Sequence, residues 1–179
     1  MKVIAICGFP GSGKTTAIEA IEDLGIIVTM GDVVREEVKN RNLEPSGNNI
    51  GKIAKELREK NGPAIIAEKC VELIKRKNEK IIFVDGVRSI SEVTVFRKYW
   101  TFPIIAIIVD EEKRFKHLFE RNRSDDPKTL EDLKERDKRE IEFGLDKVLE
   151  IAEYRIYNNS SIEALKKKAR KIVLEIIQN

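Results

Sequence analysis

Short apolar runs alternate with amphipathic stretches along the whole 179-residue chain. Strands buried on both faces are predicted where mostly apolar runs lie between polar or glycine-containing turns. These runs are KVIAIC (2–7), IIVTM (26–30), KIIFVD (80–85), FPIIAIIVD (102–110) and YRIYN (154–158). Helical periodicity fills the intervals, at about 14–25, 32–41, 48–60, 64–77, 89–99, 111–122, 129–143 and 160–178.

Turn and capping residues set the expected ends of several helices. Gly25 is expected to stop the first helix, and Pro63 suits the first turn of the helix over 64–77. The segments SISE (89–92) and SSIE (160–163) match the capping box. In this motif a serine and a glutamate three residues later bond each other's backbone N–H groups.

The regular alternation of strands and helices predicts an α/β fold. Such a chain forms a parallel sheet through right-handed crossovers, with helices on both faces. No linker, repeat or low-complexity segment interrupts the alternation, so a single domain over 1–179 is expected. Ligands of these folds bind at the carboxyl ends of the strands, and the motifs described below all lie there.

Composition narrows the class of protein. Hydrophobic residues make up 41% of the chain and charged residues 36%, as in globular proteins. The 34 basic and 31 acidic residues leave a net charge of +3, which gives no support for a nucleic-acid partner. The apolar run 104–109 is far shorter than the ~20 residues of a membrane-spanning helix. Because Met1 leads directly into the first strand, a cytoplasmic protein is predicted, as a monomer or a small homo-oligomer.

The segment GFPGSGKT (8–15) lies between a strand and a helix, as the phosphate-binding loop (P-loop, or Walker A motif) requires. Its glycines let backbone N–H groups converge on phosphate oxygens. Lys14 is expected to reach the β- and γ-phosphates of ATP, and Thr15 and Asp85 are expected to hold Mg²⁺. The predicted nucleotide-binding residues are Gly8, Pro10, Gly11, Ser12, Gly13, Lys14, Thr15 and Thr16.

A phosphate-binding loop does not determine whether the phosphate passes to a second substrate or to water. A kinase needs additional cations, because two anionic substrates must meet, and a closing element that excludes water. Arg35, in the first turn of the helix after the second strand, and Arg88, after the third strand, would bind an acceptor phosphate. Arg121, Arg123 and Arg136, around a short polar segment within 121–137, would close over the transferring phosphoryl group.

Four segments occur in the order in which they occur in nucleoside monophosphate kinases, and the chain resembles adenylate kinase most closely. That family carries a GxPGSGK loop, a TGDLLREE-like segment, DGFPR, and a lid with RSDD followed by another arginine. This chain has GFPGSGKT, MGDVVREE, DGVR, and RSDD followed by Arg136. It is also similar to the archaeal adenylate-kinase-related group of small P-loop proteins.

The resemblance implies a three-layer P-loop NTPase fold with a five-stranded parallel sheet in the order 2-3-1-4-5. It further implies a helical acceptor-binding insert at about 32–62 and a short lid at about 121–128. The implied activity is Mg²⁺-dependent phosphoryl transfer from ATP to a small nucleotide-like acceptor, a nucleoside monophosphate. The residues implied for transfer are Lys14, Arg123 and Arg136, and those implied for the acceptor are Asp32, Arg35 and Arg88.

Two departures from the family leave the acceptor open. Met30 and Glu92 stand where the family has a threonine and a glutamine that hold adenine, and Glu92 is expected to cap its own helix instead. One alternative is therefore a dephospho-coenzyme A kinase-like enzyme, in which a sugar hydroxyl is the acceptor and Asp32 would be the base. An alternative of another class is a P-loop NTPase switch whose arginines bind RNA.

Three further polar residues receive no catalytic role from the sequence. His117 lies on the charged helix over 111–122 and is expected to face solvent. Asp125 and Asp126 are expected to brace the arginines of the lid, since carboxylates beside several arginines form ion pairs with them.

Overall fold

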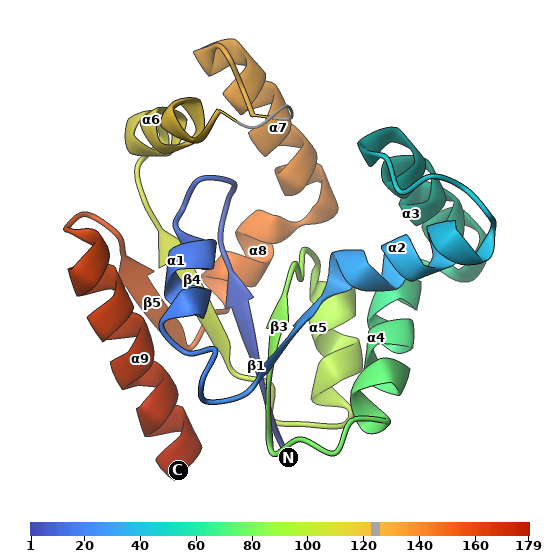
Figure 1. Ribbon diagram of the computed structural model, residues 1–179, viewed down its shortest axis with the longest axis horizontal. Helices are drawn as coiled ribbons and strands as arrows, with labels where there is room; N and C mark the ends of the chain where they lie inside the picture. Colours follow the sequence, from blue (N-terminus) through green and yellow to red (C-terminus); the bar gives the residue numbers. More distant parts are fainter. Residues whose placement is uncertain (123–125) are drawn as a thin grey trace.

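The computed structural model describes residues 1–122 and 126–179. Strands and helices alternate along most of this part of the chain (Figure 1). In chain order the elements are β1 (Lys2–Cys7), α1 (Lys14–Glu19), β2 (Ile26–Thr29), α2 (Met30–Asn40), α3 (Gly47–Asn61), α4 (Ile65–Lys75), β3 (Ile81–Asp85), α5 (Ile90–Arg97), β4 (Ile104–Ile108), α6 (Glu111–Arg121), α7 (Leu130–Phe143), α8 (Leu145–Glu150), β5 (Tyr154–Tyr157) and α9 (Ile162–Gln178).

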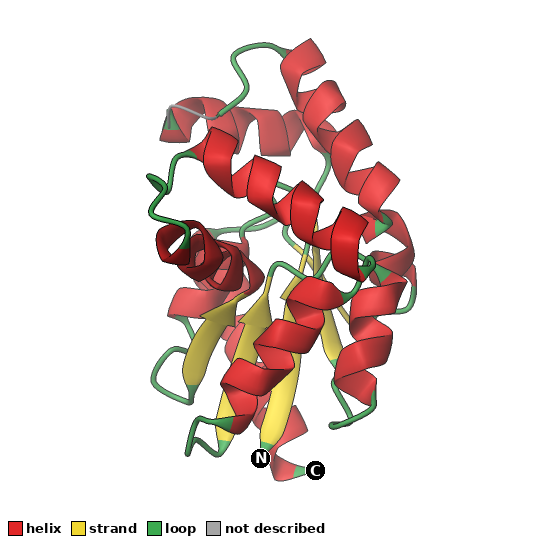
Figure 2. Cartoon of the chain, turned by 90° about the vertical axis from the view of Figure 1, so that its right-hand side faces the viewer, coloured by secondary structure: helices red, strands yellow, loops and turns green. Residues whose placement is uncertain are grey.

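The strands form one sheet in the order β2-β3-β1-β4-β5, with every neighbouring pair parallel. The sheet lies between two layers of helices (Figure 2). Both the predicted α/β class and the strand order 2-3-1-4-5 are confirmed. None of the helices in the described ranges has both the length and the apolar composition needed to cross a bilayer.

Each face of the sheet has its own apolar core, because successive side chains of a strand point to opposite faces. Val3, Ala5 and Cys7 of β1 belong to the core that also holds residues of α2, α4 and α5. Ile4 and Ile6 of the same strand belong to the core beneath α1 and α9. Burial on both faces explains why the central strands are apolar at consecutive positions.

Two helix boundaries differ from the predictions in ways that affect the argument, and one helix was not predicted. α1 ends at Glu19, and the chain continues through i→i+3 turns such as Leu24 N to Ile21 O. Gly25 therefore does not stop this helix; a Cβ there would lie 2.5 Å from the carbonyl oxygen of Ile81. α2 begins at Met30, so Arg35 lies in its second turn rather than its first. The short helix α8, which follows α7 after a glycine, was not predicted.

Two of the predicted caps also differ in detail. α9 is capped by Ser161, whose hydroxyl accepts from the backbone N–H of Ala164, so the box at 160–163 does not form. At α5 the Ser89 hydroxyl does accept from the N–H of Glu92. The Glu92 carboxylate, however, accepts from the N–H of Arg88, one residue before the expected partner.

Candidate functional site

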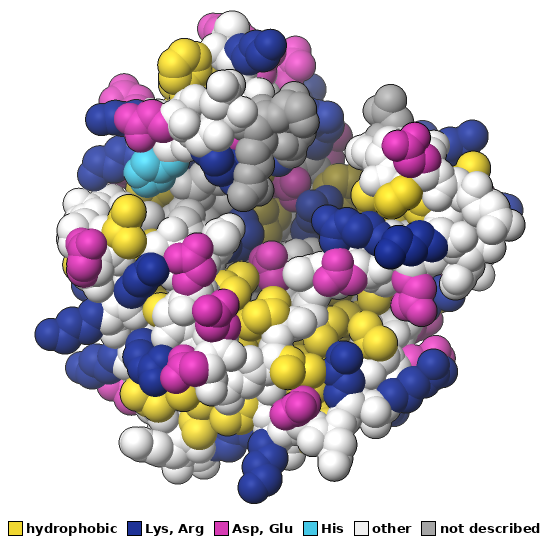
Figure 3. Space-filling view, in the orientation of Figure 1, with side chains coloured by type: hydrophobic (Ala, Val, Ile, Leu, Met, Phe, Trp, Pro, Cys, Tyr) yellow, Lys and Arg dark blue, Asp and Glu magenta, His cyan; other side chains and the backbone are white. Residues whose placement is uncertain are grey.

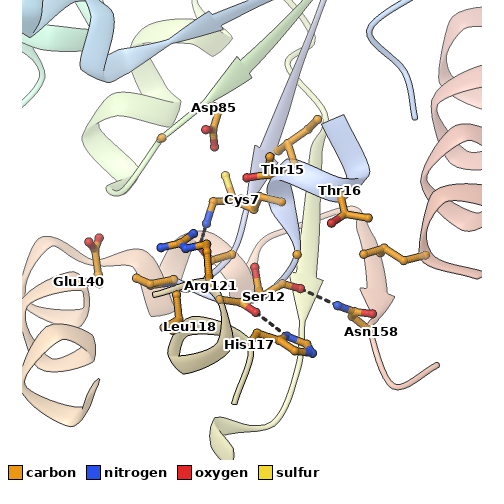
Figure 4. A pocket seen from close by; sticks show the side chains of 18 of the residues that line it. Cys7, Ser12, Thr15, Thr16, Asp85, His117, Leu118, Arg121, Glu140 and Asn158 are labelled. Atoms are coloured by element: carbon orange, nitrogen blue, oxygen red, sulfur yellow. Dashed lines mark hydrogen bonds between the residues drawn. The ribbon is translucent and has the colours of Figure 1, made fainter. Parts of the chain in front are cut away.

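A cavity of about 580 Å³ opens at the carboxyl ends of the central strands. Its walls come from the P-loop, the end of β3 with the following turn, α6, α7, and the segment from β5 into α9 (Figure 4). On the surface the molecule is hollowed between α6–α7 and α2–α3, and Lys and Arg side chains border the hollow (Figure 3). All predicted nucleotide-binding residues line the cavity, namely Gly8, Pro10, Gly11, Ser12, Gly13, Lys14, Thr15 and Thr16.

Two glycines of the P-loop are required by backbone conformation and by close neighbours. Gly11 has φ +78°, and a Cβ there would lie 2.8 Å from the backbone oxygen of Arg114. Gly13 has φ +101°, and its Cβ would lie 2.7 Å from Nδ2 of Asn158. Side chains at these positions would be strained as well as crowded, so the loop can follow this path only with glycine.

Lys14 Nζ donates to the carbonyl oxygens of Gly8 at 2.7 Å and Phe9 at 3.3 Å. Burial lowers the pKa of Lys14, and the nearby carboxylate of Asp85 acts in the opposite direction. The ammonium group thus sits in a poorly solvated place and would be stabilised by a bound phosphate.

Asp85 ends β3 and faces the same cavity. Burial raises the pKa of its carboxyl group, while Lys14 and Arg88 counteract the shift. Within the described residues, its buried Oδ1 has no hydrogen-bond partner. An unpaired buried carboxylate oxygen beside a phosphate-binding loop fits a Mg²⁺ ligand or a ligand of Mg²⁺-bound water.

The described residues hold no cluster of three or more His, Cys, Asp or Glu side chains able to bind a metal ion. This agrees with the way in which Mg²⁺ binds at phosphate sites, through one or two protein oxygens, phosphate oxygens and water. The protein oxygens available here are those of Asp85 and of the exposed Thr15 hydroxyl, both in the cavity wall.

Three of the predicted arginines line the cavity, namely Arg88, Arg121 and Arg136. Arg88 Nε lies 3.3 Å from Oε2 of Glu140. Arg136 lies 3.7 Å from Oδ1 of Asp126, whose carboxylate also accepts from Arg121. Asp126 therefore forms ion pairs with two of the arginines that it was expected to brace, whereas the lid itself stays a prediction. The predicted lid residues Arg123 and Asp125 lie outside the described residues.

The other two predicted acceptor residues are not part of the cavity wall. Arg35 and Asp32 form an ion pair at 2.5 Å on α2, and about half of each side chain is exposed. Arg88 is thus the one predicted acceptor residue among the described residues that line the cavity.

Glu92 is buried, with 1% of its surface exposed, and both of its carboxylate oxygens have partners. Oε1 accepts from Arg58 at 3.3 Å, and Oε2 accepts from the backbone N–H of Arg88 at 2.8 Å. Met30 is also buried, with 4% of its surface exposed. Neither residue presents a free polar group to a nucleotide base.

Glu140, Asn158 and His117 are polar cavity residues to which the sequence assigned no place in the site. Glu140 follows Arg136 by one helical turn, and this i, i+4 spacing was available as a signal. Asn158 follows the fifth strand, and its Nδ2 donates to Ser12 O at 2.9 Å. His117 is exposed as expected, but its Nδ1 lies 3.0 Å from Gly11 O, so the ring reaches the P-loop (Figure 4).

Comparison with known proteins assigns the chain to a family. Residues 7–134 match the family described as "AAA domain". A "UPF0200/UPF0201 protein" from Archaeoglobus fulgidus is 45% identical over 184 residues, covering 100% of this chain and 57% of that protein. The chain thus spans little more than half of that relative. A "UPF0200 protein" from Methanosarcina mazei is 37% identical over 181 residues, covering 99% of this chain and 97% of that protein.

Among solved structures, shikimate kinase from Acinetobacter baumannii in complex with shikimate has a TM-score of 0.58. The match covers 100% of this chain and 94% of that chain, at 17% sequence identity, so it concerns the fold alone. The parallel sheet, the P-loop at the end of β1 and these matches agree with one another. The chain belongs to the UPF0200 protein family and contains an AAA domain with a P-loop kinase-like fold.

Proposed function

We propose that the protein transfers the γ-phosphoryl group of ATP to a small nucleotide-like acceptor, with a nucleoside monophosphate as the first candidate. One observation carries this proposal: a single cavity is lined by the donor-side residues Lys14, Thr15 and Asp85 and by Arg88 and Arg136 from other elements. A nucleotide-binding protein without a second anionic substrate has less need for these two additional cations.

The roles follow from the chemistry of each side chain. Lys14 and the P-loop N–H groups would hold the phosphates of ATP, and Thr15 and Asp85 would hold Mg²⁺, which neutralises phosphate charge when bound. Arg136 would stabilise charge on the transferring group, together with Arg123 of the proposed lid. Such transfer depends on positioning and charge neutralisation and requires no general base when the acceptor is a phosphate.

Two positions that hold adenine in adenylate kinases have other residues in this chain, Met30 and Glu92. The Glu92 carboxylate is already paired and Met30 is buried, which argues against AMP held by this pair of positions. A hydroxyl acceptor, as in a dephospho-coenzyme A kinase-like enzyme, is the second candidate. It is favoured by the carboxylate of Glu140 in the cavity wall, since a hydroxyl needs a base. Asp32, outside that wall, would need the insert over about 32–62 to close first.

An assay of ADP release tests the proposal. The full chain with Mg·ATP is offered AMP, CMP, UMP, GMP, their deoxy forms and dephospho-coenzyme A, each in a separate reaction. We expect one acceptor to stimulate release, and Lys14→Met to abolish that stimulation. Release that no acceptor stimulates would favour the NTPase switch and would count against a kinase.

A further inference from the structure

Helix α6 contacts the outer side of the P-loop backbone at consecutive residues. Arg114 Nη1 donates to the carbonyl oxygen of Pro10 at 3.3 Å, and its guanidinium lies 5.1 Å from the centre of the Phe9 ring. His117 Nδ1 donates to the carbonyl oxygen of Gly11 at 3.0 Å. The P-loop is therefore held against α6 by two side chains, of which His117 lines the cavity and Arg114 does not.

Arg114 is held in turn by a buried carboxylate on α7. Its Nη1 and Nη2 donate to Oδ1 and Oδ2 of Asp137 at 2.9 and 2.5 Å. The two residues are only 6% and 8% exposed. A buried bidentate pair is costly to desolvate, and apolar residues of similar volume often give equal or greater stability. Stability alone therefore does not require this pair.

The position of Asp137 on α7 links the pair to the cavity. Asp137 directly follows Arg136, and Glu140 lies one turn further along the same helix. Arg136 and Glu140 both line the cavity. The ion pair at Asp137 fixes the rotation of α7 about its own axis, and this rotation turns the two side chains toward the cavity. One guanidinium thus joins the P-loop, α6 and α7.

We propose that Arg114 is a positioning residue that fixes the position of the P-loop relative to α7. This inference rests on the proposed phosphoryl transfer. The Pro10 carbonyl that it binds belongs to the peptide unit carrying the N–H of Gly11. In a planar trans peptide the two groups point in opposite directions, so holding the carbonyl on α6 directs that N–H away from α6. Arg114 acts through the P-loop and Arg136 rather than by touching the substrate.

The test replaces the pair by apolar residues, in the double variant Arg114→Met, Asp137→Leu. Matched to it is Arg170→Met, Asp23→Leu. Arg170 also makes two bonds to one aspartate, at 2.6 and 2.8 Å, and a third to a backbone carbonyl, that of Ala20 at 2.9 Å. The control thus removes the same kinds of contact, at the end of α1 away from the P-loop.

The readouts are the melting temperature, the Kd for Mg·ADP and hydrogen exchange. We expect the Arg114 variant to melt within a few degrees of the natural protein but to bind Mg·ADP about tenfold more weakly, as for loss of a charge-assisted hydrogen bond. Amides at 9–14 and 130–143 should exchange faster, and those of the central strands should not. The control should keep its Kd and its exchange at 9–14.

The proposal would be overturned if the double variant bound Mg·ADP as tightly as the natural protein. It would also be overturned if hydrogen exchange in the double variant became faster throughout the chain, in proportion to the stability lost. Should the double variant fail to fold, Arg114→Lys replaces it, since lysine keeps the charge but cannot make all three bonds. Its Kd should rise likewise, and an unchanged Kd would again overturn the proposal. If the natural protein binds Mg·ADP but no acceptor takes phosphate, the proposed function fails, whereas these measurements still decide the role of Arg114.

Discussion

Replacing Gly11 by alanine tests whether the P-loop depends on its close approach to α6. Alanine at φ +78° costs about 1 kcal/mol for the left-handed backbone. Its Cβ would also lie 2.8 Å from the backbone oxygen of Arg114 and 2.9 Å from Cγ of Leu118. Relieving such crowding costs about 1–3 kcal/mol, because α6 must move or the loop must distort. The free energy of unfolding should therefore fall by about 2–4 kcal/mol.

Urea unfolding of the full chain measures this loss, with Gly51→Ala as the matched control. Gly51 lies within α3, and a Cβ there meets nothing within 4 Å. Alanine should stabilise that helix by about 0.5–1 kcal/mol. The Gly11 variant should lose about 1 M or more of its urea midpoint with an unchanged slope. Equal midpoints for Gly11→Ala and the natural protein would refute the packing of the P-loop against α6.

Three more substitutions test the charges of the site. Lys14→Met should abolish Mg·ADP binding without lowering the melting temperature, because the buried ammonium lacks solvation in the free protein. Calorimetric titration measures the binding, and retained binding would contradict the prediction. Burial raises the pKa of Asp85, so as the pH rises past the ordinary carboxyl pKa of 3.8 the unfolded chain loses this proton before the native state does. The natural protein should thus lose stability relative to Asp85→Asn as the pH rises from about 4, and parallel melting temperatures from pH 4 to 7 would speak against it. Glu92→Ala should lower the free energy of unfolding in urea by about 2–4 kcal/mol, since Arg58 and the backbone N–H of Arg88 lose their buried partner. A loss below about 0.5 kcal/mol would show that these two contacts of Glu92 are dispensable.

The sheet and the P-loop could be predicted because their signals are local. Each central strand is apolar on both faces, and the order of the motifs matches that of a known family. The P-loop residues line the cavity because the chain enters the loop directly from β1 and leaves it into α1.

Other features depend on contacts between distant parts of the chain and were missed. α1 was predicted to run to Gly25, but that glycine is needed for its approach to Ile81, a contact that no periodicity reveals. α8 has only six residues, too few for a helical pattern to emerge. The approach of His117 to Gly11 depends on how α6 packs, and its sequence context indicated only a charged helix surface.

The most direct test of the central claim follows the γ-phosphoryl group itself. The full chain is incubated with Mg²⁺, ATP labelled at the γ-phosphate and the acceptor that best stimulates ADP release, and the labelled products are separated. We predict that the label moves to the acceptor, and that Lys14→Met prevents the transfer. Label recovered only as inorganic phosphate, at a rate that no acceptor changes, would contradict the assignment of a kinase.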